Sequence, residues 1–335
     1  MILTRAPLRI SFVGGGTDLP TFYRKYPGRV ISVTINKYVY SIVHSTPLVD
    51  KFTARYSKTE SVLHPKDIEH PSIKAALLDL GITKPGVEVG TFADLPAKTG
   101  LGSSSSFSAA LLKGLHVHLG KKLNAEETAR AACRLEIDLL GEPIGKQDQY
   151  AAAYGGLNFI QFNKDDSVDI RPIFLDYKKR SSLEEHIILF FTGITRHAPD
   201  ILKIQNMGVD DNYETYKKMS DSVFDFEKKL LNGDIRGMAE MLHAGWINKK
   251  SLASNISNST IDSFYDAGQT AGAWGGKILG AGGGGCILFI ADPQMHDRIR
   301  KSVGEIATKN NLKDFREIPI RFVQSGTDVL FNVKT

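Results

Sequence analysis

Hydrophobic and polar positions alternate along the first half of the chain in a way that predicts strands backed by helices. Residues 8–13 and 30–43 follow the period of strands, and Ile31, Val33 and Ile35 would share one face. A further strand is predicted over 87–92, and an apolar run over 104–119 predicts the helix that follows it. The pattern therefore favours a fold that mixes helices and strands.

Capping residues and glycines define three shorter elements. A helix is expected after Asn124, whose side chain would cap it together with Glu127, and its apolar stripe would consist of Ala132, Leu135 and Leu139. Another short helix begins near residue 147 and ends before a pair of glycines at 155–156. A strand is predicted over 157–162.

Charge-rich stretches at 163–169 and 176–185 indicate the boundary between two halves of the chain. We expect an N-terminal domain over 1–170 and a C-terminal domain over 171–335. Strands are predicted at 187–191 and 286–291. A long amphipathic helix that ends at Asn232 and Gly233 is predicted by apolar side chains spaced three and four apart, namely Tyr213, Tyr216, Met219, Val223, Phe226 and Leu230.

Composition narrows the class of protein. Hydrophobic residues make up 42% and charged residues 24% of 335 positions, and no apolar run approaches the roughly 20 residues that span a bilayer. The N-terminus enters a strand pattern without a signal-peptide core, so we expect a cytoplasmic protein with no membrane partner. The net charge of +5 contains no long basic block, which argues against nucleic acid as a partner. A mixed-charge surface accounts for most of that excess, although it also suits an anionic small substrate.

Cysteine and histidine usage adds little chemistry. Cys133 and Cys286 lie in apolar patterns and are expected to be reduced and buried. The nine histidines form no close pairs with cysteines at zinc-ligand spacing.

A glycine and serine segment at 100–106 lies between the strand predicted at 87–92 and the helix predicted at 104–119. Gly100 and Gly102 permit backbone geometry that other residues avoid, and a helix start adds unpaired N–H donors, so the segment can hold an anion such as phosphate. An ordinary turn with a serine cap is the alternative, and the strand-to-helix context favours the phosphate site. The segment is not a Walker loop, because no Lys-Ser or Lys-Thr follows a properly spaced glycine pair.

Two further glycine-rich segments stand near the ends of the chain. Residues 277–286 contain a formal GxGxxG match, but this segment leads into a strand, so a dinucleotide site is rejected. A tight hairpin, or a backbone that approaches another group closely, explains its four adjacent glycines. Residues 7–20 form a strand that ends in glycines followed by Thr17 and Asp18.

Taken in this order, the three segments resemble those of the GHMP kinases, the family of galactokinase, homoserine kinase, mevalonate kinase and phosphomevalonate kinase, and the resemblance covers essentially the whole chain. It implies an α+β GHMP kinase fold, with an N-terminal ribosomal-protein-S5-domain-2-like domain and a C-terminal ferredoxin-like domain that enclose the active site. The strings at 9–20, 35–38, 100–106 and 145–153 look most like the branch that phosphorylates D-glycero-D-manno-heptose 7-phosphate. The Gly-Gly-Gly-Thr-Asp string is also similar to that of the L-fucokinases, and it departs from the Gly-Glu-His of galactokinases.

The resemblance also implies roles for individual residues. Asp148 would be the catalytic base, and Arg9 would lie beside it and favour its charged form. Mg²⁺ would be held by Ser104 and Glu136. Residues expected to bind ATP are Ser57, Lys98, Gly100, Leu101, Gly102, Ser103, Ser104 and Ser105; those expected to bind the sugar are Gly15, Gly16, Thr17, Asp18, Arg196, Gly282 and Gly283. Taken alone, Glu136 would be a surface glutamate, and Asp148 an acid interacting with a helix dipole.

The implied activity is ATP-dependent phosphorylation of the anomeric hydroxyl of D-glycero-D-manno-heptose 7-phosphate to the 1,7-bisphosphate, with ATP and Mg²⁺ as cofactors, in the synthesis of nucleotide-activated heptose for surface polysaccharide. The alternatives are an anomeric kinase of fucose or another sugar, and a non-catalytic ATP and sugar sensor. The motifs do not identify the partner of the substrate phosphate, and the candidates are Arg24, Arg29, Lys37, Lys146 and Arg196. A homodimer is compatible with the sequence, which does not determine the oligomeric state.

Overall fold

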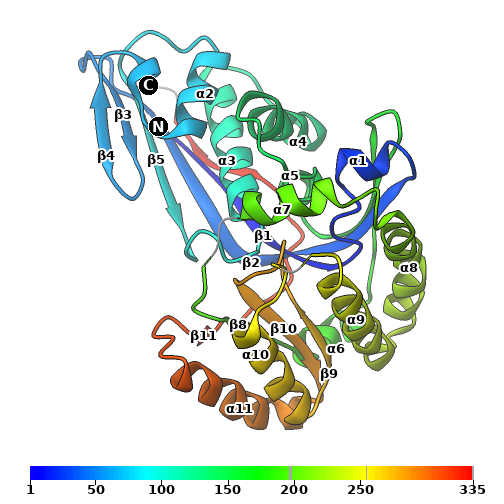
Figure 1. Cartoon of the computed structure of the whole chain (residues 1–335). Coiled ribbons are helices and arrows are strands. Elements are labelled where there is room, and N and C mark those ends of the chain that lie inside the picture. The colour runs from blue at the N-terminus through cyan, green and yellow to red at the C-terminus, as the bar shows by residue number, and fades with distance from the viewer. Residues whose placement is uncertain (196–197, 254, 334–335) are drawn as a thin grey trace.

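A long mixed sheet forms the first half of the molecule in the computed structural model, which describes residues 1–195, 198–253 and 255–333 (Figure 1). Its strands run in the order β12-β1-β2-β5-β3-β4, and β6 extends it by pairing with both β2 and β7. Neighbouring strands are antiparallel except β3 and β5, which are parallel. The strands are β1 (Ile2–Val13), β2 (Gly28–Ser45), β3 (Phe52–Arg55), β4 (Thr59–Val62), β5 (Val87–Ala93), β6 (Leu157–Phe162), β7 (Val168–Pro172) and β12 (Asp328–Asn332).

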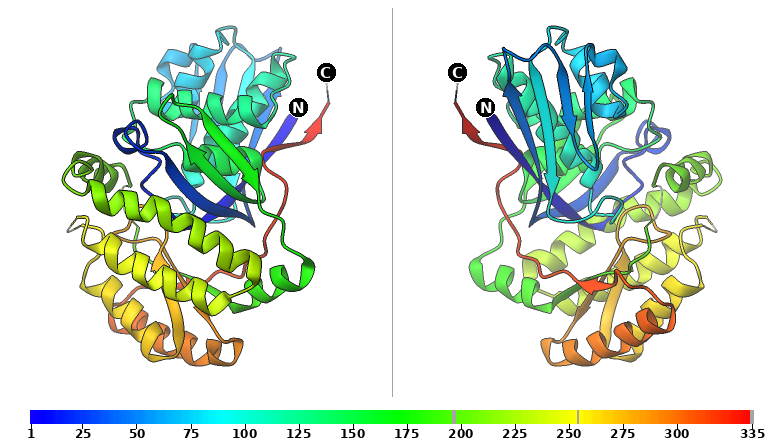
Figure 2. Two further views of the ribbon diagram at one scale, coloured as in Figure 1. Left: turned by 90° about the vertical axis from the view of Figure 1, so that its right-hand side faces the viewer. Right: turned by 90° about the vertical axis from the view of Figure 1, so that its left-hand side faces the viewer.

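Helices gather against one side of this sheet in Figures 1 and 2. They are α2 (Pro71–Asp79), α3 (Ser103–His118), α4 (Ala125–Cys133) and α5 (Gln147–Tyr154), with the short α1 (Pro20–Tyr23) and a 3₁₀ turn (Pro65–Asp67) at the periphery. The predicted cap of α4 is confirmed, because the Asn124 side chain accepts from the Glu127 N–H and the Glu127 carboxylate accepts from the Asn124 N–H.

The predicted stripe of α4 is wrong at its end. Ala132 and Leu135 are buried, but Leu139 is 39% exposed. A π-helical turn (Arg134–Leu139) follows α4 and widens the helix, so later side chains rotate away from the direction that a regular helix would give. The same turn directs Glu136 inward, where it is 2% exposed.

The second half is built on a four-stranded antiparallel sheet in the order β11-β8-β10-β9. Its strands are β8 (Ile187–Phe191), β9 (Ala273–Ile278), β10 (Cys286–Ala291) and β11 (Arg316–Glu317); the helices are α6 (Tyr177–His186), α7 (Ala198–Met207), α8 (Tyr213–Asn232), α9 (Ile235–Lys250), α10 (Ser259–Thr270) and α11 (His296–Lys309), with a 3₁₀ turn (Pro293–Met295). The predicted strands 187–191 and 286–291 are confirmed. The long helix α8 ends as expected, with Gly233 in the left-handed conformation at φ +74. Within the described ranges, no helix is long and apolar enough to cross a membrane.

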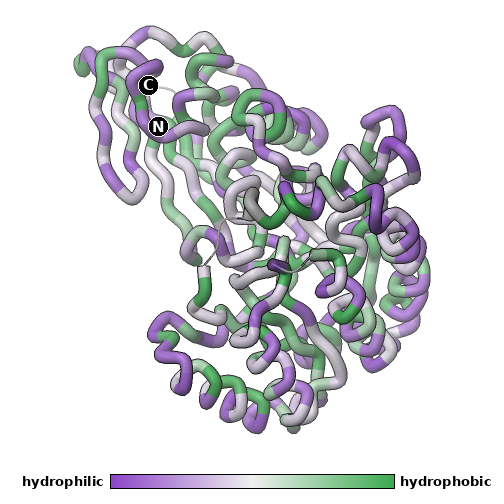
Figure 3. The backbone as a smooth tube through the Cα atoms, viewed as in Figure 1, coloured by the Kyte–Doolittle hydropathy of each residue, from purple (hydrophilic) through white to green (hydrophobic). Residues whose placement is uncertain are grey.

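One hydrophobic cluster joins the two sheets. It includes Leu8 and Ile10 of β1, Phe226 of α8, Leu189 of β8 and Leu288 of β10, all at most 1% exposed. In Figure 3 the helices at the edge, such as α11, alternate hydrophobic and hydrophilic stretches as expected for one buried face. Because the two halves share this core, packing fixes the position of one half against the other. The two cysteines are free and buried.

The end of the chain returns to the first sheet, where β12 pairs with β1 and places Asn332 opposite Ile2. The strand β7 spans residue 170, where the charge pattern placed the domain boundary. The division into 1–170 and 171–335 stays a prediction. The first sheet contains strands from both sides of this boundary, because β12 pairs with β1.

Candidate active site

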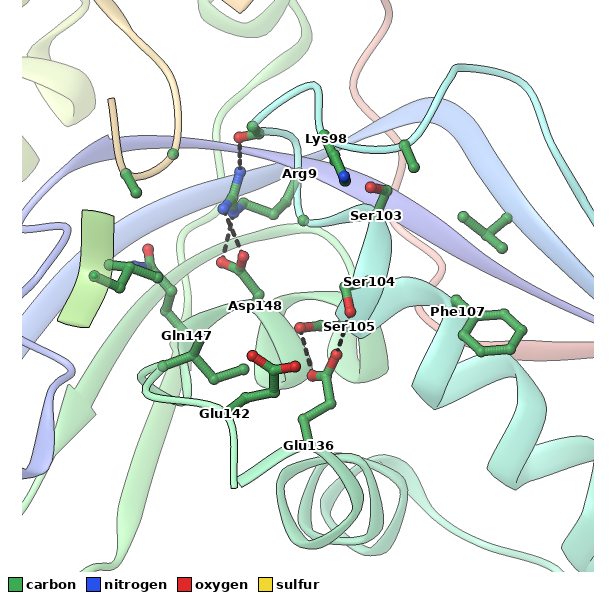
Figure 4. A pocket seen from close by; sticks show the side chains of 18 of the residues that line it. Arg9, Lys98, Ser103, Ser104, Ser105, Phe107, Glu136, Glu142, Gln147 and Asp148 are labelled. Carbon is green, nitrogen blue, oxygen red and sulfur yellow. Dashed lines mark hydrogen bonds and ion pairs between the residues drawn. The ribbon is translucent and has the colours of Figure 1, made fainter. Parts of the chain in front are cut away.

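A cavity of about 720 Å³ lies between the two halves. Its walls come from the end of β1, the loop between β5 and α3, the start of α3, the segment that precedes α5, and the helices α7 and α9 (Figure 4). Predicted site residues that line it are Arg9, Gly15, Gly16, Asp18, Ser57, Lys98, Gly100, Gly102, Ser103, Ser104, Ser105, Glu136 and Asp148. Segments far apart in the sequence therefore meet at one place, as the resemblance implied.

The loop before α3 has the geometry that its glycines allow. Gly102, at φ +77, is the residue before the first turn of α3, and a Cβ there would lie 3.2 Å from Arg9 Cγ. A Cβ on Gly100, at φ +79, would lie 2.4 Å from the Leu279 carbonyl oxygen, so a side chain would collide with the opposite half. Lys98 is exposed with φ +67, and its side chain lies near Ser103 in Figure 4. The start of a 16-residue helix and a lysine thus face the cavity, which suits an anion.

Arg9 and Asp148 form a two-bond ion pair behind this loop. Arg9 Nε and Nη2 donate to the two carboxylate oxygens of Asp148, each at 2.7 Å, and Nη1 donates to the Gly100 carbonyl at 2.6 Å. The arginine side chain is 4% exposed and that of Asp148 is 26% exposed. Asp148 is therefore held rigidly while part of its carboxylate reaches the cavity.

Glu136 is the second carboxylate of the site. It accepts from the hydroxyls of Ser104 at 2.6 Å and Ser105 at 2.7 Å and from Gln149 Nε2 at 2.6 Å. Burial raises its pKa, and the three hydrogen bonds counteract that effect. Figure 4 shows Glu142 beside it, with its carboxylate directed into the cavity between Glu136 and Asp148.

These side chains supply hard oxygen donors, which Mg²⁺ prefers. No group of three acidic, histidine or cysteine side chains in the described part of the chain is placed to hold a metal alone. Mg²⁺ usually keeps several waters, so Ser104 with Glu136 fits such a partly hydrated ion.

Asp18 is tied to the segment that carries Asp148. Its carboxylate accepts from the N–H of Gly16 and from the backbone and side-chain N–H groups of Gln147, at 3.0 to 3.1 Å. The Ser11 hydroxyl donates to Gln147 Oε1 at 2.9 Å. Burial raises the pKa of Asp18, with a smaller contribution in the same direction from the Asp148 charge.

An aromatic wall closes the opposite end of the cavity. The His70 ring stands 4.7 Å from Tyr56 and 5.3 Å from Phe107 between ring centroids, and all three line the cavity together with Ser57. Burial lowers the pKa of His70, which favours the neutral ring. Such a wall can stack against a planar nucleobase.

Some predicted site residues lie outside the described lining of the cavity. Thr17 is fully buried and its hydroxyl bonds to the backbone of Gly14 and Arg29, so it holds the turn that presents Asp18. Leu101 is also fully buried. Gly282 and Gly283 lie against the backbone of Ile256 and are not among the described lining residues of the cavity. Arg196 lies outside the described residues.

The glycine-rich segment at 277–286 packs against the loop before α3, and this close packing explains its glycines. Cys286 N–H donates to the Thr99 carbonyl at 2.8 Å, and a Cβ on Gly285 would lie 2.6 Å from the same oxygen. Gly280 and Ala281 reach the cavity wall itself. The close backbone approach expected for this cluster is therefore present.

Known proteins resemble the chain over its whole length. The family model of the GHMP kinases N terminal domain matches residues 71–156, and that of the GHMP kinases C terminal matches residues 226–307. The D-glycero-alpha-D-manno-heptose 7-phosphate kinase of Campylobacter jejuni is 30% identical, over 94% of this chain and 99% of that protein. The chain belongs to the GHMP kinase family. The expected α+β GHMP kinase fold and the expected enzyme of the kinase class are thereby confirmed.

Two more relatives place the chain among these GHMP kinases. A crystal structure of a D-glycero-D-manno-heptose 1-phosphate kinase from Bacteroides thetaiotaomicron superposes with a TM-score of 0.82 at 26% identity, covering all of both chains. The bifunctional fucokinase/GDP-fucose pyrophosphorylase of Arabidopsis thaliana is 27% identical over 90% of this chain and 31% of that protein.

The structure also brings side chains to the cavity that the sequence analysis missed. Glu142 lies in a segment without a recognisable pattern. Lys249 and Lys277 line the wall formed by the second half, whereas Arg24, Arg29 and Lys146 pair with acids outside the described lining. The sequence did contain a signal for Lys249, because this residue continues the helical spacing of the buried side chains Met238, Leu242 and Trp246 of α9.

Proposed function

We propose that this GHMP kinase transfers the γ-phosphoryl group of ATP to the anomeric hydroxyl of D-glycero-D-manno-heptose 7-phosphate and forms the 1,7-bisphosphate. The product would serve the synthesis of nucleotide-activated heptose for surface polysaccharide. The observation that carries the proposal is the convergence of the Arg9–Asp148 pair, the start of α3 and the Asp18–Gln147 pair on one cavity. The likeness to heptose phosphate kinases supports the choice of sugar.

In this proposal the adenine lies against Tyr56, Ser57, His70 and Phe107, and the phosphates lie at the start of α3. The N–H groups there, with Lys98, bind the phosphate oxygens. Bound Mg²⁺ would be held by Ser104 and Glu136 and would neutralise charge on the phosphates. Glu142 would supply a further oxygen donor to the bound ion or to its waters.

Asp148 orients the anomeric hydroxyl and accepts its proton. The hydroxyl oxygen forms a bond to the γ-phosphorus, the bond from that phosphorus to the bridging oxygen breaks, and ADP leaves with the electron pair. The two bonds from Arg9 fix the direction of the carboxylate, which is the main requirement of phosphoryl transfer. Asp18 accepts hydrogen bonds from sugar hydroxyls, held in place by Gln147.

The test is ADP release from a panel of acceptors that contains the heptose 7-phosphate, the unphosphorylated heptose, L-fucose and D-galactose. We expect the heptose 7-phosphate to have the highest kcat/KM, and phosphorus NMR of the product to show the second phosphate on the anomeric carbon. Equal or better turnover of L-fucose would replace the heptose assignment with a fucokinase-like one, which the Arabidopsis relative makes the main competitor. Binding of ATP and sugar with no ADP release would instead indicate a sensor.

A further inference from the structure

Two lysines from different elements meet in the wall that the second half contributes to the cavity. Lys249 lies in the last turn of α9 and Lys277 in β9, and their side chains line the cavity while the residues are only 7% and 8% exposed. Lys249 Nζ donates to the Gly280 carbonyl at 2.7 Å. Lys277 Nζ donates to the carbonyls of Ser11 and Phe12 at 3.0 and 2.9 Å.

This placement is costly in the absence of a bound anion. The acceptors of Lys277 in the described structure are the neutral carbonyl oxygens of Ser11 and Phe12, and an ammonium buried without a negative partner is unfavourable. Burial lowers the pKa of Lys277 well below its ordinary value, and the positive charges of Lys249 and Arg9 lower it further. The charges of Lys249 and Arg9 thus both act on Lys277, and an anion bound beside it would favour its charged form.

In the proposed function the acceptor lies where Asp18 and Asp148 line the cavity, which we call the acceptor end, and a phosphorylated acceptor bound there requires cations. Asp18 and Asp148 face it, and both repel an acceptor that already carries a phosphate of nearly two negative charges. Cationic side chains among the described lining residues are Arg9, Lys98, Lys249 and Lys277. Arg9 is engaged by Asp148 and Gly100, and Lys98 belongs to the loop that precedes α3.

We infer that Lys249 and Lys277 bind the phosphate group that the acceptor carries before the reaction, at the wall formed by α9 and β9. This inference rests on the proposed function in that the acceptor is a sugar phosphate. Gln205, which lines the same wall and donates to the Ala281 carbonyl at 2.9 Å, holds the backbone beside Gly280 in place. An ammonium has three N–H donors, so each lysine can bind a phosphate oxygen in addition to a carbonyl.

The test is Lys249→Met, which keeps an unbranched side chain of similar length and removes the charge. The matched control is Lys250→Met on the same helix, because Lys250 pairs with Asp262 and lies outside the described lining of the cavity. We expect Lys249→Met to raise the KM of the phosphorylated acceptor about 10- to 100-fold, the range for losing a hydrogen bond to a charged group. The KM of ATP should stay within about twofold, and Lys250→Met should match the wild type.

Inorganic phosphate provides a probe that does not depend on the variant folding. On the wild-type enzyme it should inhibit competitively against the acceptor, and Lys249→Met should weaken that inhibition by the same factor. Inhibition competitive with ATP alone, or a Lys249→Met variant that raises only the KM of ATP, would assign the lysines to the nucleotide phosphates and overturn the inference.

Failure of the proposed function has a different signature. If the wild-type enzyme prefers an acceptor other than the heptose 7-phosphate, the sugar assignment fails. The phosphate site is then judged by inorganic phosphate competing with whichever acceptor is turned over. No competition there, with full activity on an unphosphorylated sugar, would refute the lysine site as well.

Discussion

Replacing Asp148 by Asn tests whether this carboxylate performs the chemistry or only holds the fold. The structure gives Asp148 two charge-assisted hydrogen bonds from Arg9, both of 2.7 Å. An asparagine keeps one acceptor oxygen and turns an NH₂ group toward the other arginine N–H. One of the two bonds is lost, and the proton acceptor disappears with the negative charge.

The two effects differ in size. A hydrogen bond to a charged group contributes about 1.5 to 3 kcal/mol to the free energy of unfolding. Because the Asp148 side chain is 26% exposed and Arg9 keeps its bond to Gly100, we expect the lower end, about 1.5 kcal/mol. Loss of a positioned base lowers kcat by about 10²- to 10⁴-fold. A protein of ordinary stability stays folded after a loss of about 1.5 kcal/mol, so unfolding cannot account for a hundredfold loss.

The assay combines steady-state ADP release with denaturant unfolding and ATP binding. Asp79→Asn is the matched control, since Asp79 also accepts two bonds from an arginine, Arg134, whose side chain is 55% exposed. We expect the control to lose less than about 1 kcal/mol and to keep the wild-type kcat. If Asp148→Asn keeps kcat within about tenfold of the wild type, Asp148 is not the base, and the ion pair with Arg9 is structural.

Three further changes test other parts of the site. Gly102→Ala should cost about 1 to 2 kcal/mol of backbone strain, and it should raise the KM of ATP because its Cβ would press on Arg9 Cγ. Gly120 is the control, since it has the same φ of +77 and open space around it. Gly120→Ala should therefore show the strain without the change in KM. Glu136→Gln should raise the Mg²⁺ concentration that gives half-maximal activity but leave the protein folded. Gln149 Oε1, which is buried without a partner in the described structure, can turn to accept from the new amide. Burial raises the pKa of Asp18 and Glu136, so the folded state binds their protons more tightly than the unfolded state does. The contribution of these two carboxyls to the free energy of unfolding of the ligand-free protein should therefore fall as pH rises above 3.8 and 4.5. The stability of the wild type relative to Glu136→Gln should fall over that range, and a difference independent of pH would contradict the assignment.

Local signals were enough to locate β1, β2, β5, α3 and the glycine-rich loop before α3, but they did not predict α7, α9 or β9. Strand and helix periodicity gave β6, β8, β10 and α8 nearly to the residue, because their pattern and their end signals agree. The stripe of α4 failed at Leu139, because a π-helical turn has no marker in hydrophobic periodicity. The same turn is what directs Glu136 to Ser104 and Ser105, a contact that periodicity alone does not predict.

The sequence by itself determined the family, the three glycine-rich segments and the acids and serines that accompany them, since these depend on backbone conformations and residue types that are local. The tertiary structure decided which charges meet. It paired Arg9 with Asp148 across 139 positions, joined Asp18 to Gln147, and brought Lys249 and Lys277 to one wall of the cavity. The residue type of a lysine does not show whether its side chain faces solvent or a cavity. Only the packing of α9 and β9 against the first half makes these two ammonium groups candidates for binding a phosphate.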